Sequence, residues 1–288
     1  MSKITKKIKT FLNKVRTFFS LLCSPNVPKK DAWVYLYKMI RYAFGQVLAY
    51  SGIGRYVPFS VRGEYCLYLT KSPVAMVAFG DPTATRDEEH IAKDILHEGD
   101  TCLDVGANIG NFSLCAARLV GTTGHIFTFE AHPRTHMYAE RNIALNKIPE
   151  VSLLGFAIGE KKRTISFSDD AYDDINHVQE HGGVTVPMIR LDDCEQLKNL
   201  ESIACLKIDI EGYELHAFKG AVETLKKTKY VLFELYEKSA ALYGHHADDV
   251  YDFLVLQGFE IVDPKTRTPF DRKYLRKDSI QNLLAVRN

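Results

Sequence analysis

Short apolar runs alternate with stretches of helical spacing along most of the chain, from residue 86 to residue 263. Runs of about four to eight apolar residues between turn-forming residues are typical of buried strands, whereas apolar residues three and four apart indicate a helix with one buried face. We predict strands at 101–105, 124–130, 151–158, 204–210, 230–236, 259–263 and 282–287. The predicted helices are 86–97, 112–120, 133–146, 215–227 and 248–257. This alternation predicts βαβ units, and therefore a mostly parallel α/β sheet with helices on both faces.

Two parts of the pattern depart from simple alternation. Residues 164–167 and 184–190 resemble strands and flank a polar loop, 168–183. That loop is either a disordered connection or a flap that covers a substrate. The last two predicted strands are joined by the polar run 264–281, which contains no long helix, so we expect the last strand to pair antiparallel at the sheet edge.

An N-terminal extension, 1–60, precedes this α/β domain, 61–288. Residues 3–22 place apolar side chains at helical spacing among lysines, which predicts a basic amphipathic helix. Three partners remain open for its apolar stripe: the protein's own body, an anionic membrane surface, or another macromolecule. After the proline-containing break at 24–28, the pattern predicts two more elements, a packed helix at 33–50 and a β-hairpin formed by 65–70 and 74–79.

Charge is distributed unevenly along the 288 residues, of which 46% are hydrophobic, enough to bury a full core. The net charge is +1, yet residues 1–30 carry eight Lys or Arg and no acid, which leaves 29 basic against 36 acidic residues in the remainder. Nucleic acid would attract the same lysines but would give the apolar stripe of 3–22 no purpose. We therefore expect no nucleic-acid partner, and we expect peripheral contact with an anionic membrane through residues 1–22.

The six cysteines include no C-x-x-C pair, and Cys102, Cys115 and Cys205 lie within apolar runs, where we expect them to be buried. This pattern is typical of a reducing compartment. No apolar stretch reaches the roughly 18 residues that a membrane span needs, and no cleavage site follows the basic start. We expect a cytoplasmic protein that associates with a membrane only at its surface.

Candidate chemistry begins where the strand at 101–105 turns into the helix at 112–120. Asp104, Gly106 and Gly110 form the pattern D-x-G-x-x-x-G, with Ala107, Asn108 and Asn111 among and after them. Glycines at a strand-to-helix turn leave backbone N–H groups bare and let a ligand approach closely. The alternatives are a tight turn without a ligand and a nicotinamide-binding turn, but the latter requires glycines where Asn108 and Asn111 stand.

Polar residues at the ends of the other predicted strands complete a candidate ligand site. Glu130 ends the second strand, where a nucleoside-binding α/β domain places the acid that accepts both ribose hydroxyls. Residues 155–157 end the third strand and are a natural wall for an adenine ring. His132 either faces the ribose or merely precedes Pro133.

Asp209 and Glu211, two residues apart at the end of the strand 204–210, form the second candidate group. If the strand remains extended, both side chains lie on one side and face the reacting centre, where they bind a metal ion or take a proton from a hydroxyl. Alternatively, one of them caps the helix that starts near Gly212 and the other is solvated. His216 is assigned to the surface or the core, and a substrate role for His245 and His246 has no support.

These stretches together resemble the FkbM family of class I S-adenosylmethionine-dependent methyltransferases. The similar segments cover roughly 86–263 in the family's order, namely 99–110, 129–133, 157–160, 189–193, 206–214 and 219–221. Asn108 agrees with the family's "D-V-G-A-N-x-G", whereas 130–133 reads Glu-Ala-His-Pro in place of Glu-Pro-x-Pro. Residues 1–60 lie outside the resemblance.

The resemblance implies a Rossmann-like methyltransferase that transfers the sulfonium methyl group of S-adenosyl-L-methionine to a hydroxyl of a sugar or other small molecule. The implied cofactor-binding residues are Asp104, Gly106, Ala107, Asn108, Gly110, Asn111, Glu130 and Ala157, and the catalytic candidates are Asp209 and Glu211. No metal site is assigned. Because fold does not fix function, the alternative is a catalytically silent cofactor-binding or scaffold module on the same fold.

Overall fold

The structure is a computed structural model that describes residues 20, 29–51, 56–168, 178–179, 183–276 and 278–287. The chain divides into two compact units, Met1–Arg62 with Tyr68–Ala84, and Gly63–Leu67 with Thr85–Asn288. The expected domain boundary at residue 60 stays a prediction. The predicted amphipathic helix at 3–22, apart from Ser20, and most of the predicted loop at 168–183 lie outside the described residues.

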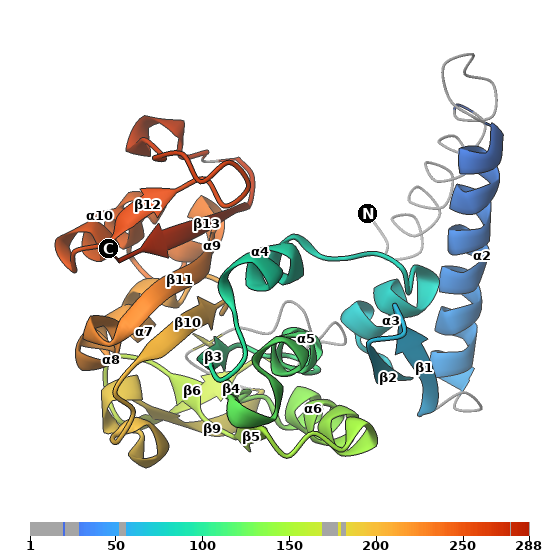
Figure 1. Cartoon of the computed structure of the whole chain (residues 1–288), viewed down its shortest axis with the longest axis horizontal. Helices are drawn as coiled ribbons and strands as arrows, with labels where there is room; N and C mark the ends of the chain where they lie inside the picture. The colour runs from blue at the N-terminus through green and yellow to red at the C-terminus, as the bar shows by residue number, and fades with distance from the viewer. Residues whose placement is uncertain are drawn as a thin grey trace. The chain divides into compact units, whose positions relative to one another are not determined.

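A seven-stranded sheet with the order β12-β13-β11-β10-β3-β4-β5 forms the centre of the larger unit (Figure 1). Its strands are β3 (Thr101–Val105), β4 (His125–Phe129), β5 (Val151–Leu154), β10 (Ile203–Ile208), β11 (Thr228–Leu235), β12 (Glu260–Val262) and β13 (Gln281–Val286). Strands β5, β4, β3, β10 and β11 run parallel to one another. Strand β13 is antiparallel to both β11 and β12. The expected methyltransferase-type sheet, with its last strand antiparallel, is therefore confirmed.

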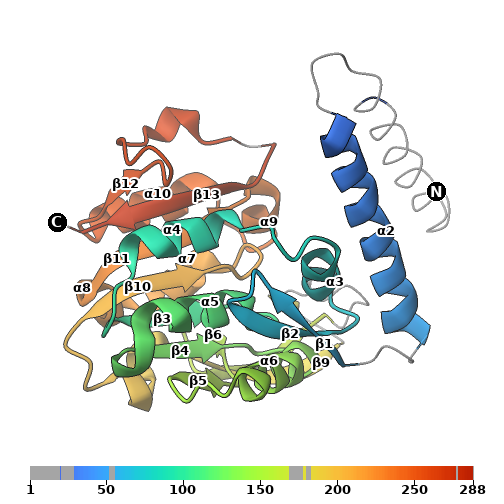
Figure 2. The same cartoon turned by 45° about the vertical axis from the view of Figure 1, so that its right-hand side comes forward.

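Helices cover both faces of this sheet (Figures 1 and 2). On one face α5 packs against β3 and β4 and also contacts α4. On the other face, residues of α7, α8 and α10 share a hydrophobic core with the sheet. The helices are α4 (Asp87–Ile95), α5 (Asn111–Val120), α6 (Pro133–Asn146), α7 (Glu214–Lys219), α8 (Val222–Lys226), α9 (Glu237–Ala241) and α10 (Ala247–Leu256). Short 3-10 helices are η1 (Gly121–Thr123), η3 (Leu191–Asp193), η4 (Glu195–Leu197) and η5 (Arg272–Tyr274).

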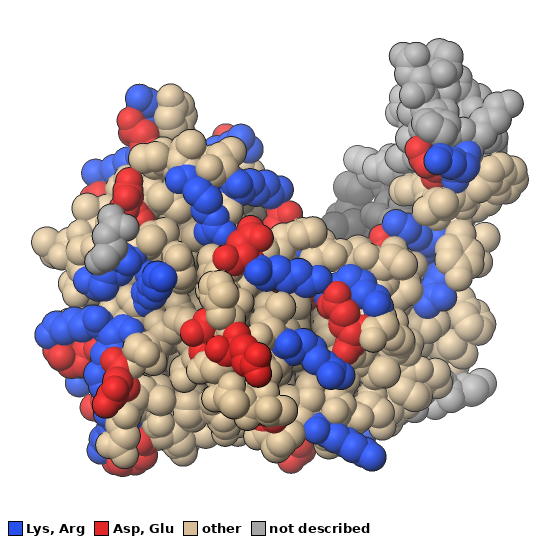
Figure 3. All heavy atoms as spheres, viewed as in Figure 1, with Lys and Arg blue, Asp and Glu red and all other residues tan. Residues whose placement is uncertain are grey.

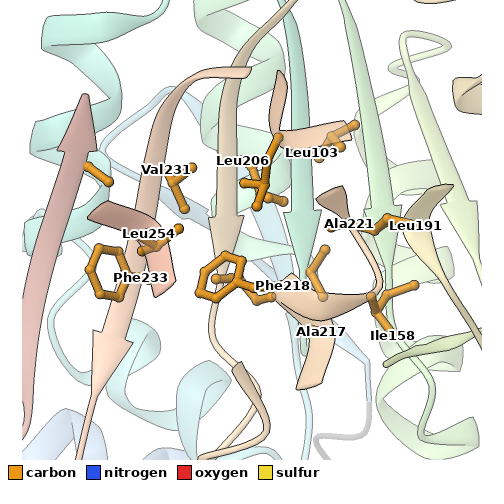
Figure 4. Packing of buried hydrophobic residues seen from close by; sticks show 14 of the residues in the cluster. Leu103, Ile158, Leu191, Leu206, Ala217, Phe218, Ala221, Val231, Phe233 and Leu254 are labelled. Atoms are coloured by element: carbon orange, nitrogen blue, oxygen red, sulfur yellow. The ribbon is translucent and has the colours of Figure 1, made fainter. Parts of the chain in front are cut away.

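Side chains of alternate residues in the central strands pack against α7, α8 and α10. Leu103, Leu206 and Val231 from three neighbouring strands lie in one cluster with Phe218 and Leu254 from the helices (Figure 4). Since successive side chains of a strand point to opposite faces, the residues between them point to the face that α5 covers. This alternation directs the polar residues of β3, β10 and β11 to the α5 side.

A second sheet, with the order β6-β9-β7-β8, interrupts the alternation. Its strands are β6 (Ala157–Ile158), β7 (Arg163–Phe167), β8 (Val178–Gln179) and β9 (Val184–Ile189). The strands predicted at 164–167 and 184–190 are confirmed, but the single strand predicted at 151–158 is wrong. It is broken at 155–156, after which β6 leaves the large sheet to pair with β9.

The single helix predicted at 215–227 is also wrong, because it is two helices, α7 and α8, that meet at Gly220. A Cβ on Gly220 would lie 2.0 Å from the carbonyl oxygen of Gly159, so only glycine permits this approach of the helix end to the chain beyond β6. The short helix α9 was not predicted, because the polar stretch after β11 has no clear helical period.

The smaller unit contains α2 (Lys29–Ser51), β1 (Val57–Val61) and α3 (Pro73–Gly80), and the unit boundary runs through β2 (Tyr65–Leu69). The helix expected at 33–50 is confirmed. The expected hairpin is wrong: 74–79 belongs to α3, and β2 pairs with β1 instead. Pro73 occupies the first helical turn after Ser72, a position that favours a helix start, and a short apolar run alone does not distinguish helix from strand.

Candidate active site

The turn between β3 and α5 has the backbone conformation that its glycines predict. Gly106, Asn108 and Gly110 have φ angles of 80°, 53° and 80°, in the left-handed region. The N–H groups of Gly106 and Ala107 both donate to the carbonyl oxygen of Phe129, at 3.0 and 3.1 Å. A Cβ on Gly106 would lie 1.9 Å from the carbonyl oxygen of Asp209, so this glycine also lets the end of β10 approach the turn.

Glu130 lies directly after β4 and is buried beside the same turn. Its Oε2 accepts the N–H of Asn108 at 2.7 Å, and its Oε1 accepts the N–H of His132 at 2.9 Å and the Thr135 hydroxyl at 2.8 Å. Burial raises the pKa of Glu130 to about 7, because its effect exceeds that of the three hydrogen bonds, which lower the pKa. A carboxylate offers about four lone-pair directions, so three accepted bonds leave one for a ligand hydroxyl.

Three residues expected at the cofactor have other contacts. The Asn111 amide donates to Glu89 Oε1 at 2.7 Å, and its Oδ1 accepts the Tyr65 hydroxyl at 3.0 Å. Ala157 is buried in a small core of the second sheet. His132 is buried at the N-terminus of α6, where its Nδ1 accepts the N–H of Arg134 at 3.3 Å. Their cofactor roles stay predictions.

Lys207 is a residue that the sequence analysis did not assign to the site. It lies on β10 opposite Asp104 of β3, and both side chains are buried. Its Nζ is 3.4 Å from Asp104 Oδ1, 3.6 Å from Asp209 Oδ2 and 3.5 Å from the carbonyl oxygen of Gly106. The two carboxylates raise the pKa of Lys207 above its ordinary value despite burial, so it is fully charged. A lysine within an apolar strand was the available signal.

The second carboxylate oxygen of Asp104 is also held in place, by a hydrogen bond. Its Oδ2 accepts the Ser113 hydroxyl at 2.5 Å, and the Thr128 hydroxyl donates to Ser113 at 2.9 Å. Its Oδ1 has no hydrogen-bond partner within the described chain and faces only the Lys207 ammonium. An acid with one oxygen held by a serine hydroxyl and the other beside a lysine suits a site that holds a cationic or hydroxyl-bearing ligand.

The turn after β10 separates the two catalytic candidates. The strand ends at Ile208, Glu211 has a φ of 57° and Gly212 a φ of 98°, so the extended conformation does not persist from Asp209 to Glu211. Glu214 stabilises the turn instead, since its Oε1 accepts the N–H groups of Ile210 and Gly212 at 3.0 and 3.2 Å. The catalytic roles of Asp209 and Glu211 stay predictions.

Glu234 follows Phe233 near the end of β11, and Phe233 pairs with Ile208 of β10. Burial raises the pKa of Glu234 to about 8, and the negative charges of Asp209 and Glu214 add to this rise. Together with Lys207, these acids make the β10–β11 part of the carboxyl edge strongly charged.

The histidines form a separate cluster. Tyr213 stacks on His216 with ring centroids 4.5 Å apart, and His216 lies edge-on to His245 at 5.6 Å. Burial lowers the pKa of His245, with a further contribution from His216. His246 binds Glu237 Oε1 through Nδ1 at 2.6 Å at the start of α10. Within the residues that can be described, no three His, Cys, Asp or Glu side chains form a group that could hold a metal ion.

The chain is similar in sequence to two named methyltransferases. The hexuronic acid methyltransferase AglP of Haloferax volcanii is 27% identical over 157 residues, which cover 52% of this chain and 63% of that protein, less than two thirds of its length. The 2-O-methyltransferase NoeI of Sinorhizobium fredii is 26% identical over 174 residues, 53% of this chain and 70% of that protein.

Solved structures give weaker likenesses. The methyltransferase FkbM of Methylobacillus flagellatus superposes with a TM-score of 0.42 at 15% identity, over 74% of this chain and 51% of that one. The S-adenosylmethionine-dependent O-methyltransferase of Thermotoga maritima gives 0.42 at 14% identity, over 73% and 70%. The profile of the methyltransferase FkbM domain matches residues 104–261, more than half of the sequence. The chain therefore belongs to the FkbM methyltransferase domain family.

Proposed function

We propose that the chain is an S-adenosylmethionine-dependent O-methyltransferase whose acceptor is a hydroxyl of a sugar or another small molecule. The observation that carries the proposal is the hydrogen bond between the Asn108 N–H and Glu130 Oε2, at 2.7 Å. It joins the glycine turn to the acid at the end of β4. The two parts expected of a nucleoside site, open backbone and a carboxylate, therefore form one local structure inside a domain of the FkbM family.

The residues at this edge suit S-adenosylmethionine. Gly106 and Gly110 give the backbone room at the turn, Glu130 retains a lone-pair direction for a ribose hydroxyl, and Asp104 Oδ1 is buried without a hydrogen-bond partner in the described chain. When bound, S-adenosylmethionine supplies an activated methyl group on a sulfonium. The protein's own part is to align the acceptor oxygen with the methyl–sulfur bond and to exclude water.

The acceptor class is drawn from two relatives. AglP is named as a methyltransferase of hexuronic acid and NoeI as a 2-O-methyltransferase. Charged and hydroxyl-binding side chains gather at the β10–β11 part of the edge, which agrees with a polar acceptor. On the face of the molecule in Figure 3, Lys and Arg are interspersed with Asp and Glu.

A transfer assay tests the proposal. The protein is incubated with methyl-labelled S-adenosylmethionine and a panel of uronic acids and oligosaccharides, and S-adenosylhomocysteine binding is measured by calorimetry. We expect binding at micromolar concentration and label in a product with a new O-methyl group. Binding without transfer to any acceptor would favour the silent scaffold module, and no binding of S-adenosylhomocysteine would contradict both functions.

We also propose that the N-terminal extension binds an anionic membrane surface, as expected for residues 1–22. Support comes from α2, where Trp33, Tyr37, Ile40, Phe44 and Val47 form a stripe at helical spacing with each side chain 56–65% exposed. Aromatic side chains and basic residues are the usual contacts with the lipid interface. No described helix is both long enough and apolar enough to cross a bilayer, and cytoplasmic localisation stays a prediction.

Vesicle co-sedimentation tests the membrane contact. In low salt the full chain should pellet with vesicles that contain anionic lipid, and pelleting should fall as salt screens the basic residues, each worth about 1 kcal/mol near such a surface. A chain lacking residues 1–22 and a Phe44→Ser variant should each pellet less. Equal pelleting of all three with anionic and neutral vesicles would contradict the proposal.

A further inference from the structure

The parallel register brings two acids together at the carboxyl edge of the sheet. Ile208 of β10 pairs with Phe233 of β11, so the next residues along, Asp209 and Glu234, are neighbours. The N–H of Asp209 donates to the carbonyl oxygen of Val105 on β3 at 3.1 Å, so on its other side β10 remains paired with β3 one residue beyond Ile208. Phe233 and Ile208 both lie in the core under α7. By alternation, Asp209 and Glu234 point to the opposite face, where Lys207 also lies.

The two acids have different charge environments. Asp209 forms an ion pair with Lys207 at 3.6 Å, and its side chain is 33% exposed. For Glu234, no described residue donates a hydrogen bond or forms an ion pair, and the side chain is only half-buried. The charged groups that face Glu234 are Asp209 after β10, Glu214 on α7, Lys207 on β10 and Glu88 on α4. Three of these four are acids.

We propose that Glu234 is the catalytic residue that accepts the proton of the acceptor hydroxyl, while Asp209, paired with Lys207, positions the same hydroxyl. This assignment rests on the proposed function and differs from the sequence prediction, which named Asp209 and Glu211 as the catalytic candidates. Two neighbouring acids in different surroundings are the usual arrangement for acid–base chemistry at neutral pH. Lys207 supplies the asymmetry, since it pairs with one acid and not with the other.

The chemical step balances without a further reactant. The acceptor O–H bond breaks and its proton moves to a Glu234 oxygen. An electron pair of the acceptor oxygen forms the new bond to the methyl carbon, and the pair of the methyl–sulfur bond moves to sulfur. The products are the O-methyl compound, S-adenosylhomocysteine without the sulfonium charge, and protonated Glu234, which returns its proton to water.

The Glu234→Gln variant tests this role, with Glu260→Gln, an exposed acid on the edge strand β12, as the matched control. The turnover number of the wild type should rise with pH through about 8, because the ionised form of Glu234 is the active base. Glu234→Gln should lower turnover by roughly 10²–10⁴-fold and abolish that rise. Affinity for S-adenosylhomocysteine should change less than about three-fold, and Glu234→Asp should restore part of the activity.

A second measurement needs no turnover. The folded pKa of Glu234, about 8, lies above its ordinary value of 4.5, so the folded protein binds more protons than the unfolded chain between these values. The free energy of unfolding therefore falls as pH rises from 4.5 to 8. This fall should be smaller in Glu234→Gln and unchanged in Glu260→Gln.

Three outcomes overturn the inference. A wild type that transfers methyl groups, with Glu234→Gln retaining the same rise in turnover with pH, contradicts the role of Glu234 alone. Activity that a chelator abolishes and a divalent cation restores makes the two acids metal ligands and also contradicts it. Absence of transfer by the wild type contradicts the proposed function and this inference together, so the two failures are distinguishable.

Discussion

The carboxyl edge of the sheet has two parts that hold their acids differently. At the ends of β3 and β4, Asp104 and Glu130 accept hydrogen bonds from hydroxyl and backbone N–H groups, three of them on Glu130. At the ends of β10 and β11, Asp209 contacts Lys207, and Glu234 interacts with its surroundings mainly through charge. Neutral donors hold both acids of the first part, although Asp104 Oδ1 also lies 3.4 Å from Lys207 Nζ. In the second part, Asp209 and Glu234 interact mainly with full charges.

This difference separates binding from proton chemistry. Hydrogen bonds from fixed donors orient a carboxylate and favour its ionised form, which suits an acid that holds a ligand hydroxyl. A carboxylate among other acids is free of such donors and retains a proton more readily, which suits a group that exchanges one. Burial is the largest cause that raises the pKa of both acids, to about 7 for Glu130 and to about 8 for Glu234. The charges of Asp209 and Glu214 come next at Glu234, whereas the charge of Asp104 is the smallest of the causes at Glu130.

Gly106→Ala should have the largest effect, because Gly106 lies where the two parts meet. The new Cβ would lie 1.9 Å from the carbonyl oxygen of Asp209, in a backbone conformation with φ of 80°. Overpacking and backbone strain each cost about 1–3 kcal/mol, so the free energy of unfolding should fall by roughly 3 kcal/mol or more. Denaturant unfolding measures this loss.

The control for that loss is Gly244→Ala. Gly244 has a similar φ of 76°, but an added Cβ would meet no atom within 4 Å. This variant should lose only about 1–2 kcal/mol, the cost of the left-handed conformation alone. Equal losses in the two variants would show that the contact between the glycine turn and the end of β10 is unimportant.

Glu130→Gln tests the binding part of the edge. Removal of the charged acceptor should weaken S-adenosylhomocysteine by about 1–3 kcal/mol, measured by calorimetry, with turnover at saturating donor changed little. Because the ionised form accepts a hydroxyl better, wild-type affinity should rise as pH increases through about 7. Glu130→Gln should lack this rise. A variant that lowers turnover but leaves affinity intact would reverse the roles of the two parts.

The effect of Glu130 ionisation on the free energy of unfolding has the opposite pH dependence to its effect on ligand affinity. The folded pKa of Glu130, about 7, exceeds its ordinary value of 4.5, so the folded state favours the protonated acid. Its contribution to the free energy of unfolding is largest below pH 4.5 and declines as pH rises to about 7. Higher pH should therefore improve ligand affinity while it reduces stability, and ligand-free unfolding of Glu130→Gln should show a smaller decline.

The sequence indicated the acids of the β3–β4 part of the edge more directly than the charged groups of the β10–β11 part. Asp104, Gly106 and Glu130 follow one another along two strands with clear apolar patterns, so local signals locate them. Lys207 was missed because its contacts depend on the register of the strands. Only the pairing of β10 with β3 and β11 shows which acids surround its side chain. Charge balance within a buried site depends on neighbours that are about 100 residues apart, as Lys207 and Asp104 are.

Errors in the predicted fold have a similar origin. The apolar run 74–79 is equally compatible with a strand and a helix, and Pro73 decided the outcome. The helix predicted at 215–227 is broken at Gly220, where the helix end approaches Gly159 closely. The strand predicted at 151–158 is broken at 155–156, where the chain leaves the large sheet and pairs with β9. The mostly parallel character of the sheet followed from the alternation, because each strand carried its own pattern, whereas the order of the strands became known only from the structure.

Asp192→Ala should have the smallest effect, because Asp192 belongs to neither part of the carboxyl edge. Asp192 lies in a segment of the family resemblance, 189–193, yet its Oδ1 accepts the N–H and hydroxyl of Thr224, and its Oδ2 the N–H of Glu223, at 2.8–3.1 Å. It thus caps α8, which ends just before β11 begins, away from the carboxyl edge. Loss of such a cap costs about 1–2 kcal/mol of unfolding free energy.

Affinity for S-adenosylhomocysteine and turnover at 25 °C should remain as in the wild type, since Asp192 contacts neither part of the edge. The matched control is Asp193→Ala: this neighbour is 49% exposed and forms a 3.6 Å ion pair with Arg190, which is worth less than about 1 kcal/mol. Calorimetry and thermal unfolding of both variants separate the outcomes. A large loss of affinity for S-adenosylhomocysteine in Asp192→Ala would mean that this segment acts on the site through α8. The site would then have a third part besides the two parts of the carboxyl edge.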